Sequence, residues 1–186
     1  MNTSPYKVVV SLPENKQNIY KGTWLAVLYT SRIPPHVGIV IDGNYNSLTI
    51  KGHELNIDLA VLIKTLQIKK IETLFIPLKK HPVFSTSYQL DVFQLYVQQF
   101  QRVSEDNTCL KPVKLFLQEF YALPFLENEL LFELIERLKQ NKYIDDAIAI
   151  NLDHLINETN EIHLPIYNSQ QLKEMIHSEL EQLSKY

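Results

Sequence analysis

Cysteine is almost absent from this chain of 186 residues, because Cys109 is the only one. A single cysteine rules out an internal disulfide framework and a zinc site built from several cysteines. Cys109 is therefore either a buried structural thiol or a reactive one.

An excess of either charge is also lacking. The 18 Lys and Arg residues stand against 21 Asp and Glu residues, for a formal net charge of -3. Such a chain has no bulk positive field of the kind that collects nucleic acid or anionic membranes, so we expect neither as a partner.

Long apolar runs are missing as well. No segment has the length of a membrane span, and Met1 to Lys16 lacks the apolar core of a secretory signal. We therefore expect a cytoplasmic protein without stable membrane insertion, although a removed signal peptide would leave no trace here.

The composition is that of an ordinary globular protein, with 45% hydrophobic and 21% charged residues. The length and the lack of a low-complexity break favour one domain over residues 1–186. We expect its core at about 21–123 and a C-terminal helical annex at about 127–186.

Apolar and β-branched runs predict strands at 7–12, 23–30, 37–41, 45–50 and 71–78. Asp42-Gly43-Asn44 tolerates positive φ, so the third and fourth runs should form a β-hairpin with one buried and one accessible face.

Apolar residues at helical spacing predict helices in the rest of the chain. These helices cover 55–70, 88–103, a segment from Cys109 to before Pro124, 127–139 and 169–183, with a short apolar segment at 144–150 and a loop at 153–161. The predicted fold class is α+β, with an antiparallel sheet packed against helices.

Cys109 follows a polar break and stands at or next to the start of a helix. A thiol there lies near the positive end of the helix dipole, which stabilises the thiolate and lowers the pKa from its ordinary value of about 8.5. This favours a nucleophile. The competing interpretation is a small buried hydrophobe, the usual role of a free cysteine.

His36 is the candidate partner, because a neutral imidazole can deprotonate a thiol and then protonate a leaving group. Strand alternation places His36 on one face with Gly38, and in the following strand with Ser47 and Thr49.

The group that orients His36 depends on the hairpin register. If Gly43-Asn44 forms the turn, His36 lies near Thr49, whose hydroxyl could orient the imidazole. His53 and Glu54, just past the strand end, are the alternatives.

Three stretches carry a resemblance to a known family: Lys21 to Leu28, Pro35 to Ile50, and Thr108 to Val113. Their order resembles the circularly permuted branch of the papain-like NlpC superfamily, which includes lecithin–retinol acyltransferase-like enzymes. In that branch a His-x-Gly-Ile-x-x-Asp-Gly strand precedes the helix that bears the nucleophilic cysteine. The resemblance covers roughly residues 21–120.

The resemblance implies a permuted papain-like fold with Cys109 as nucleophile, His36 as general base and Thr49 as orienting group. The Cys109 backbone N–H would help to hold the oxyanion. Thr49 departs from the family, which usually presents His, Glu, Asn or Gln at that position.

Together these observations predict a cysteine hydrolase (peptidase or amidase) or acyltransferase, with a peptide, amide or acyl substrate bearing an amide, ester or thioester. The alternative is a non-catalytic binding module that retains the fold, and residues 88–186 could also mediate homo-oligomer formation. No cofactor or metal is expected, because His81, His154 and His163 lack helical partners for a metal site.

Overall fold

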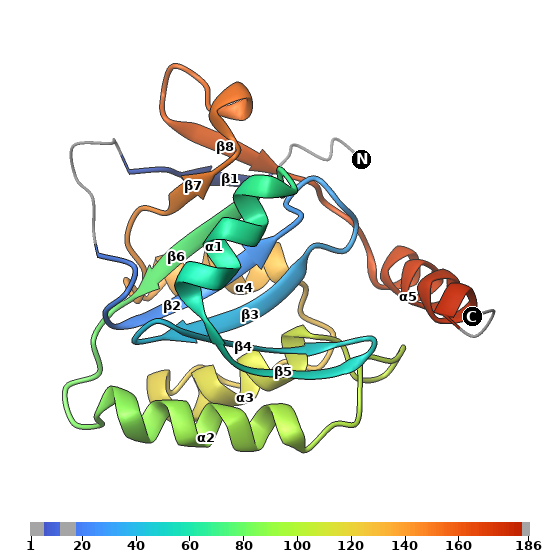
Figure 1. Ribbon diagram of the computed structural model, residues 1–186, viewed down its shortest axis with the longest axis horizontal. Coiled ribbons are helices and arrows are strands. Elements are labelled where there is room, and N and C mark those ends of the chain that lie inside the picture. Colours follow the sequence, from blue (N-terminus) through green and yellow to red (C-terminus); the bar gives the residue numbers. More distant parts are fainter. Residues whose placement is uncertain (1–5, 12–17, 184–186) are drawn as a thin grey trace.

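The structure, a computed structural model, describes residues 6–11 and 18–183. Within these residues the chain forms an α+β protein with five α-helices, a six-stranded antiparallel sheet and a two-stranded sheet (Figure 1). The large sheet has the strand order β5-β4-β3-β2-β6-β7, and β1 pairs with β8.

The strands are β1 (Tyr6–Val9), β2 (Thr23–Leu28), β3 (His36–Ile41), β4 (Asn44–Thr49), β5 (Gly52–Asp58), β6 (Thr73–Leu78), β7 (Ile148–Ile150) and β8 (Glu161–Leu164). The helices are α1 (Leu59–Ile68), α2 (Thr86–Gln98), α3 (Leu110–Tyr121), α4 (Leu131–Gln140) and α5 (Ser169–Leu183), with a short 3-10 helix at Asp153–Leu155.

Both faces of the large sheet are buried at its centre, in β2 and β6. Leu25 and Val27 of β2 belong to the main core with residues of α2, α3 and α4. Trp24 and Ala26 face the other way, into a second core with α1. Figure 1 shows α1 in front of the sheet and α4 behind it. The predicted accessible face of the hairpin is therefore wrong, because α1 covers it.

The hairpin turn consists of Asp42 and Gly43, with φ values of 45° and 79°. Two positive φ values in a two-residue loop define the type I′ turn that suits the twist of a hairpin. Ile41 pairs with Asn44, and Gly38 pairs with Ser47. The turn is thus one residue earlier than Gly43-Asn44, which moves every cross-strand partner by two positions.

The helix predicted at 55–70 begins only at Leu59. Leu55 and Ile57 lie in β5, where their alternation fits a strand that pairs with β4. Asp58 ends the strand and caps α1, since its carboxylate accepts hydrogen bonds from the backbone N–H groups of Ala60 and Val61. The helical spacing of leucines across residues 55–62 hid this boundary.

Other expectations fare better. The helix expected at 88–103 appears as α2, which Ser85 caps and which ends already at Gln98. Helix α3 follows Cys109 directly, and α5 spans the predicted 169–183. The helix expected at 127–139 begins at Leu131, because the residues before it form an irregular loop. The predicted strand 7–12 appears as β1, and its last residue lies outside the described residues. β8 was not predicted, since its partner β1 is distant in sequence.

Gly38 is a site where the hairpin tolerates no side chain. A Cβ there would lie 2.6 Å from the Asn46 carbonyl oxygen and 2.6 Å from Cε2 of Tyr45. We expect Gly38→Ala to lower the free energy of unfolding by about 1–3 kcal/mol, because backbone cannot yield as a flexible side chain does. Denaturant titration would measure the loss, with Lys51→Ala at an exposed turn as control. An unchanged Gly38→Ala midpoint would contradict this close packing.

Candidate functional site

A cavity of about 650 Å³ lies at the end of the large sheet where β3 begins. His36, Thr49, Glu54 and Cys109 all line it. The fold therefore brings the two main candidate residues, far apart in sequence, to one cavity, which we call the Cys109 cleft.

Cys109 occupies the N-cap position of α3, and its side chain makes no capping hydrogen bond. The backbone N–H groups of Val37, Cys109 itself and Leu110 favour the charged form of its thiol. Val37 is the residue directly after His36, so the start of β3 contributes to the electrostatic environment of the thiol.

Burial governs the charge state of this thiol. It raises the pKa of Cys109 to about 11, although the N–H groups of Val37 and Leu110 act in the opposite direction. The residue as a whole is half-buried. The pKa lowering expected from a helix N-terminus is therefore wrong, because loss of hydration outweighs the backbone dipoles.

His36 begins β3 and is also half-buried. Its Nε2 lies 3.1 Å from Oγ of Ser47, and that hydroxyl lies 2.9 Å from Oε2 of Glu54. The three side chains thus form a chain of hydrogen bonds that ends at a carboxylate with access to solvent.

This chain of hydrogen bonds assigns the tautomer of His36. A serine hydroxyl has one proton, and an ionised carboxylate can only accept, so Ser47 donates to Glu54. Nε2 of His36 must then donate to Ser47, which leaves the Nδ1 lone pair free. A histidine held in this way can accept a proton at Nδ1.

The imidazole is neutral in this environment. Burial, together with the nearby positive charge of Arg32, lowers the pKa of His36 to about 4. Cys109 and His36 therefore rest as a neutral thiol and a neutral imidazole at neutral pH.

The predicted orienting group, Thr49, lines the cleft but its hydroxyl is used elsewhere. Thr49 Oγ1 donates to the carbonyl of Gly52 and accepts from the N–H of Lys51, both at 3.1 Å. His53, an alternative, hydrogen-bonds the Phe100 carbonyl through Nε2. In the observed register Ser47 pairs with Gly38 and so reaches His36 diagonally, whereas the hydroxyl of Thr49 is held by the turn into β5.

Of the residues near His36, sequence reasoning named Glu54 as an alternative and placed Ser47 on the correct face. It missed the role of Ser47 as the link between them. The Asp-Gly dipeptide, a preferred type I′ turn, indicates the observed register, but that register alone would place Thr49 opposite His36 and so gives no signal for Ser47.

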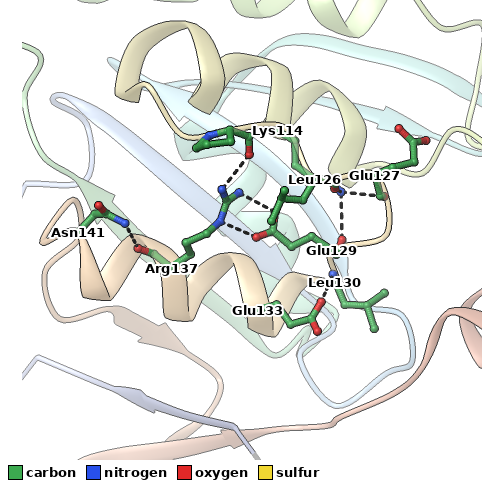
Figure 2. Close-up of polar contacts among 9 residues, drawn as sticks. Lys114, Leu126, Glu127, Glu129, Leu130, Glu133, Arg137 and Asn141 are labelled. Atoms are coloured by element: carbon green, nitrogen blue, oxygen red, sulfur yellow. Dashed lines mark hydrogen bonds and ion pairs between the residues drawn. The ribbon is translucent and has the colours of Figure 1, made fainter.

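One wall of the cleft is the loop between α3 and α4. Figure 2 shows Lys114 extending from α3 to this loop. Lys114 is only 5% exposed. Its ammonium donates to the carbonyls of Leu126, Glu127 and Glu129, and so satisfies its three N–H bonds with backbone alone. Burial lowers the pKa of Lys114, and the carboxylate of Glu129 opposes this effect.

A second cation anchors the same loop. Nη1 of Arg137 donates to the carbonyl of Pro124 at 2.8 Å, and Nη2 donates to Oε2 of Glu129, also at 2.8 Å. Figure 2 shows Arg137 and Glu129 facing each other above α4. Sequence reasoning missed this network, although Lys114 stands among the apolar residues on the buried side of α3.

Other kinds of site find no support in the described part of the chain. Over residues 6–11 and 18–183, no group of three or more His, Cys, Asp or Glu side chains could hold a metal ion. No helix among these residues is both long and apolar enough to cross a membrane.

Comparisons of the chain with protein-family models, with curated proteins and with solved structures gave no match.

The low pKa of His36 makes stability depend on pH. An unfolded chain protonates His36 below about 6.5, whereas the folded protein does so only near 4. This contribution to stability is full above pH 6.5 and is lost as the pH falls toward 4. Relative to His36→Gln, we expect the wild type to lose about 1–3 kcal/mol of unfolding free energy over this range.

Denaturant titrations at several pH values would measure the difference between the two proteins. His163→Gln, at an exposed position, controls for the exchange itself. If the unfolding free energies of the wild type and of His36→Gln change with pH in parallel, folding does not hold His36 neutral.

Lys114 can be tested by removing its charge while keeping its length. Lys114→Met removes the donor from three carbonyls, two part-buried and that of Glu129 buried, so we expect the unfolding free energy to fall by about 1–3 kcal/mol. The loop should become sensitive to proteases. Lys139→Met, exposed in α4, should change stability by less than about 0.5 kcal/mol. Equal effects of the two variants would argue against the anchor.

Proposed function

We propose that the protein is a cysteine hydrolase or acyltransferase with a circularly permuted papain-like fold. The observation that carries this proposal is the hydrogen-bonded chain from His36 through Ser47 to Glu54 in the cleft that also holds Cys109. A nucleophile, a base and a group that orients the base are the parts that such catalysis needs.

The fold assignment rests on the order of elements. A strand, the His36 strand, a third strand and a later helix that begins after Cys109 follow one another as in the permuted papain-like branch. The orienting group is where the chain differs from our first expectation, since Ser47 backed by Glu54 takes the role given to Thr49.

The chemistry would run in two stages. Sγ of Cys109 attacks the carbonyl of an amide, ester or thioester, and Nδ1 of His36 takes the thiol proton. The leaving group accepts this proton as the tetrahedral intermediate collapses to a thioester on Cys109. Water or a second acyl acceptor then attacks the thioester, with His36 again as base. Backbone N–H groups of Cys109 and Leu110, which favour negative charge at the thiol, would be donors for the oxyanion.

The pKa values of Cys109 and His36 are poorly matched for proton transfer between them. The pKa values of about 11 for Cys109 and about 4 for His36 differ by about seven. Transfer of the proton would then cost on the order of 10 kcal/mol. Catalysis therefore requires that a polar substrate or entering water stabilise the ion pair.

The same mismatch favours the second candidate, a non-catalytic binding module that uses the cleft to hold a partner. Acyl transfer to Cys109 distinguishes the two functions. A hydrolase or acyltransferase forms a thioester with a reactive ester, and a binding module does not.

The test uses p-nitrophenyl esters and acyl thioesters with detection of the acyl adduct by intact mass. We expect His36→Gln to slow acylation by about 100-fold or more, the usual cost of losing a general base. Ser47→Ala should slow it by about 10-fold or more because the ring loses its orientation. Thr49→Ala is the matched control, with little change.

Cys109→Ser controls for acylation at other side chains. An adduct of equal rate in Ser47→Ala and Thr49→Ala would remove Ser47 from the proposed site. Failure of the wild type to acylate with any of these esters would leave the binding module as the function.

A further inference from the structure

The last helix, α5, forms the outer wall of the Cys109 cleft. Ser169, Leu172, Lys173, Ile176 and Glu179 line the cleft, at spacings that fall on one side of a helix. Ile176 is 3% exposed and is the one buried residue of α5. Figure 1 shows α5 at the side of the protein, apart from the other helices.

Two ion pairs connect α5 to the segments that carry the candidate catalytic residues. Arg32, in the loop before His36, pairs with Glu179. Glu105, in the loop before Cys109, pairs with His177 at 2.9 Å. All four side chains are at least 29% exposed. Exposed pairs of this kind change an equilibrium by about fivefold or less.

The segment before α5 is held more firmly than the helix. Tyr167 is buried and packs edge-to-face on Phe132, with ring centroids 5.8 Å apart. Asn168 then caps the helix, since its Oδ1 accepts from the N–H of Gln171 at 2.9 Å. The helix therefore has a fixed start, one buried apolar residue at Ile176, two partly buried ones at Leu172 and Leu180, and two exposed ion pairs.

We propose that α5 is a lid, closed over the Cys109 cleft in this structure, which swings open from its start at Tyr167 and Asn168 to admit substrate. Opening would remove Ile176 and Leu172 from the cleft and hydrate the thiol and the imidazole. It would also remove the negative charge of Glu179, which contributes to the raised pKa of Cys109. The proposal rests on the proposed function for its biological meaning, but its test does not need turnover.

The single cysteine makes the opening directly measurable. Ellman's reagent, an aromatic disulfide, reacts with the Cys109 thiolate to give a mixed disulfide and one thionitrobenzoate ion, whose absorbance reports the rate. A lid predicts that this rate follows the open fraction of α5. Ile176→Asp should raise the rate by about 10-fold or more, because a buried carboxylate opposes closure.

Met175→Asp is the matched control, since Met175 is the neighbouring residue and is 41% exposed. It introduces the same charge on the same helix and should leave the rate within about twofold of the wild type. Equal rates for the two variants, with both proteins folded by circular dichroism, would overturn the lid.

A charge exchange tests the connection to the His36 loop without disturbing the apolar contact. Arg32→Glu and Glu179→Arg should each raise the rate by about two- to fivefold, and the double variant should restore it toward the wild type. This series also decides the question if Ile176→Asp fails to fold. Equal rates in all four proteins would overturn the proposal.

Global unfolding must be separated from lid opening. Leu138→Ala removes a fully buried side chain of α4 that does not line the cleft. If the thiol reacts through lid opening, this destabilised variant should react at the wild-type rate. A rate that rises in proportion to its loss of stability would show that Cys109 reacts only on unfolding, and would overturn the lid.

The outcomes for the lid and for the proposed function are distinct. If the α5 variants change the rate of labelling but no ester acylates Cys109, the lid stands and the protein is a binding module with a lid. If esters acylate Cys109 but the α5 variants leave the labelling rate unchanged, the proposed hydrolase stands and the lid is overturned.

Discussion

The fold depends on a sheet whose central strands are buried on both faces. β2 lies at its centre with no exposed residue, and apolar side chains alternate between the core under α1 and the core under α2, α3 and α4. Such a sheet has little room for a polar site on either face, because buried polar groups need partners. The end of the sheet is where polar groups can gather, and the Cys109 cleft lies there.

The end of one ladder creates the site. β3 pairs with β4 only from Gly38 and Ser47 onward. Just before that point the N–H of Val37 favours the charged form of the Cys109 thiol, and the ring of His36 hydrogen-bonds the hydroxyl of Ser47. The N–H of Val37 and the side chain of His36, which lie beyond the end of the ladder, are thus available to the start of α3.

Local signals predicted much of this arrangement. Capping and apolar spacing located α2, α3 and α5, and strand alternation placed His36 and Ser47 on one face. The boundary at Asp58 was lost because leucines on both sides of it share a helical spacing by coincidence. Pattern reasoning is strongest where one period is unbroken.

Most of the remaining features depend on contacts between segments distant in sequence, so local sequence patterns could not predict them. The pKa of Cys109 depends on how completely other segments cover the thiol, and α5 comes from the far end of the chain. The choice of Ser47 over Thr49 depends on the hydrogen bonds that the Thr49 hydroxyl makes in the turn into β5. β8 finds its partner only through the distant β1.

Helix α3 unites the two sides of the cleft. Its N-terminus presents Cys109, and little more than one turn later Lys114 fixes the loop that forms a wall of the same cleft. Because both groups lie on one short helix packed in the core, a shift of α3 would move the nucleophile and the wall together. The distance between thiol and wall is therefore set by a rigid element. The opposite wall, α5, has Ile176 as its one buried residue, so under the lid proposal adaptation to a bound molecule falls to that side.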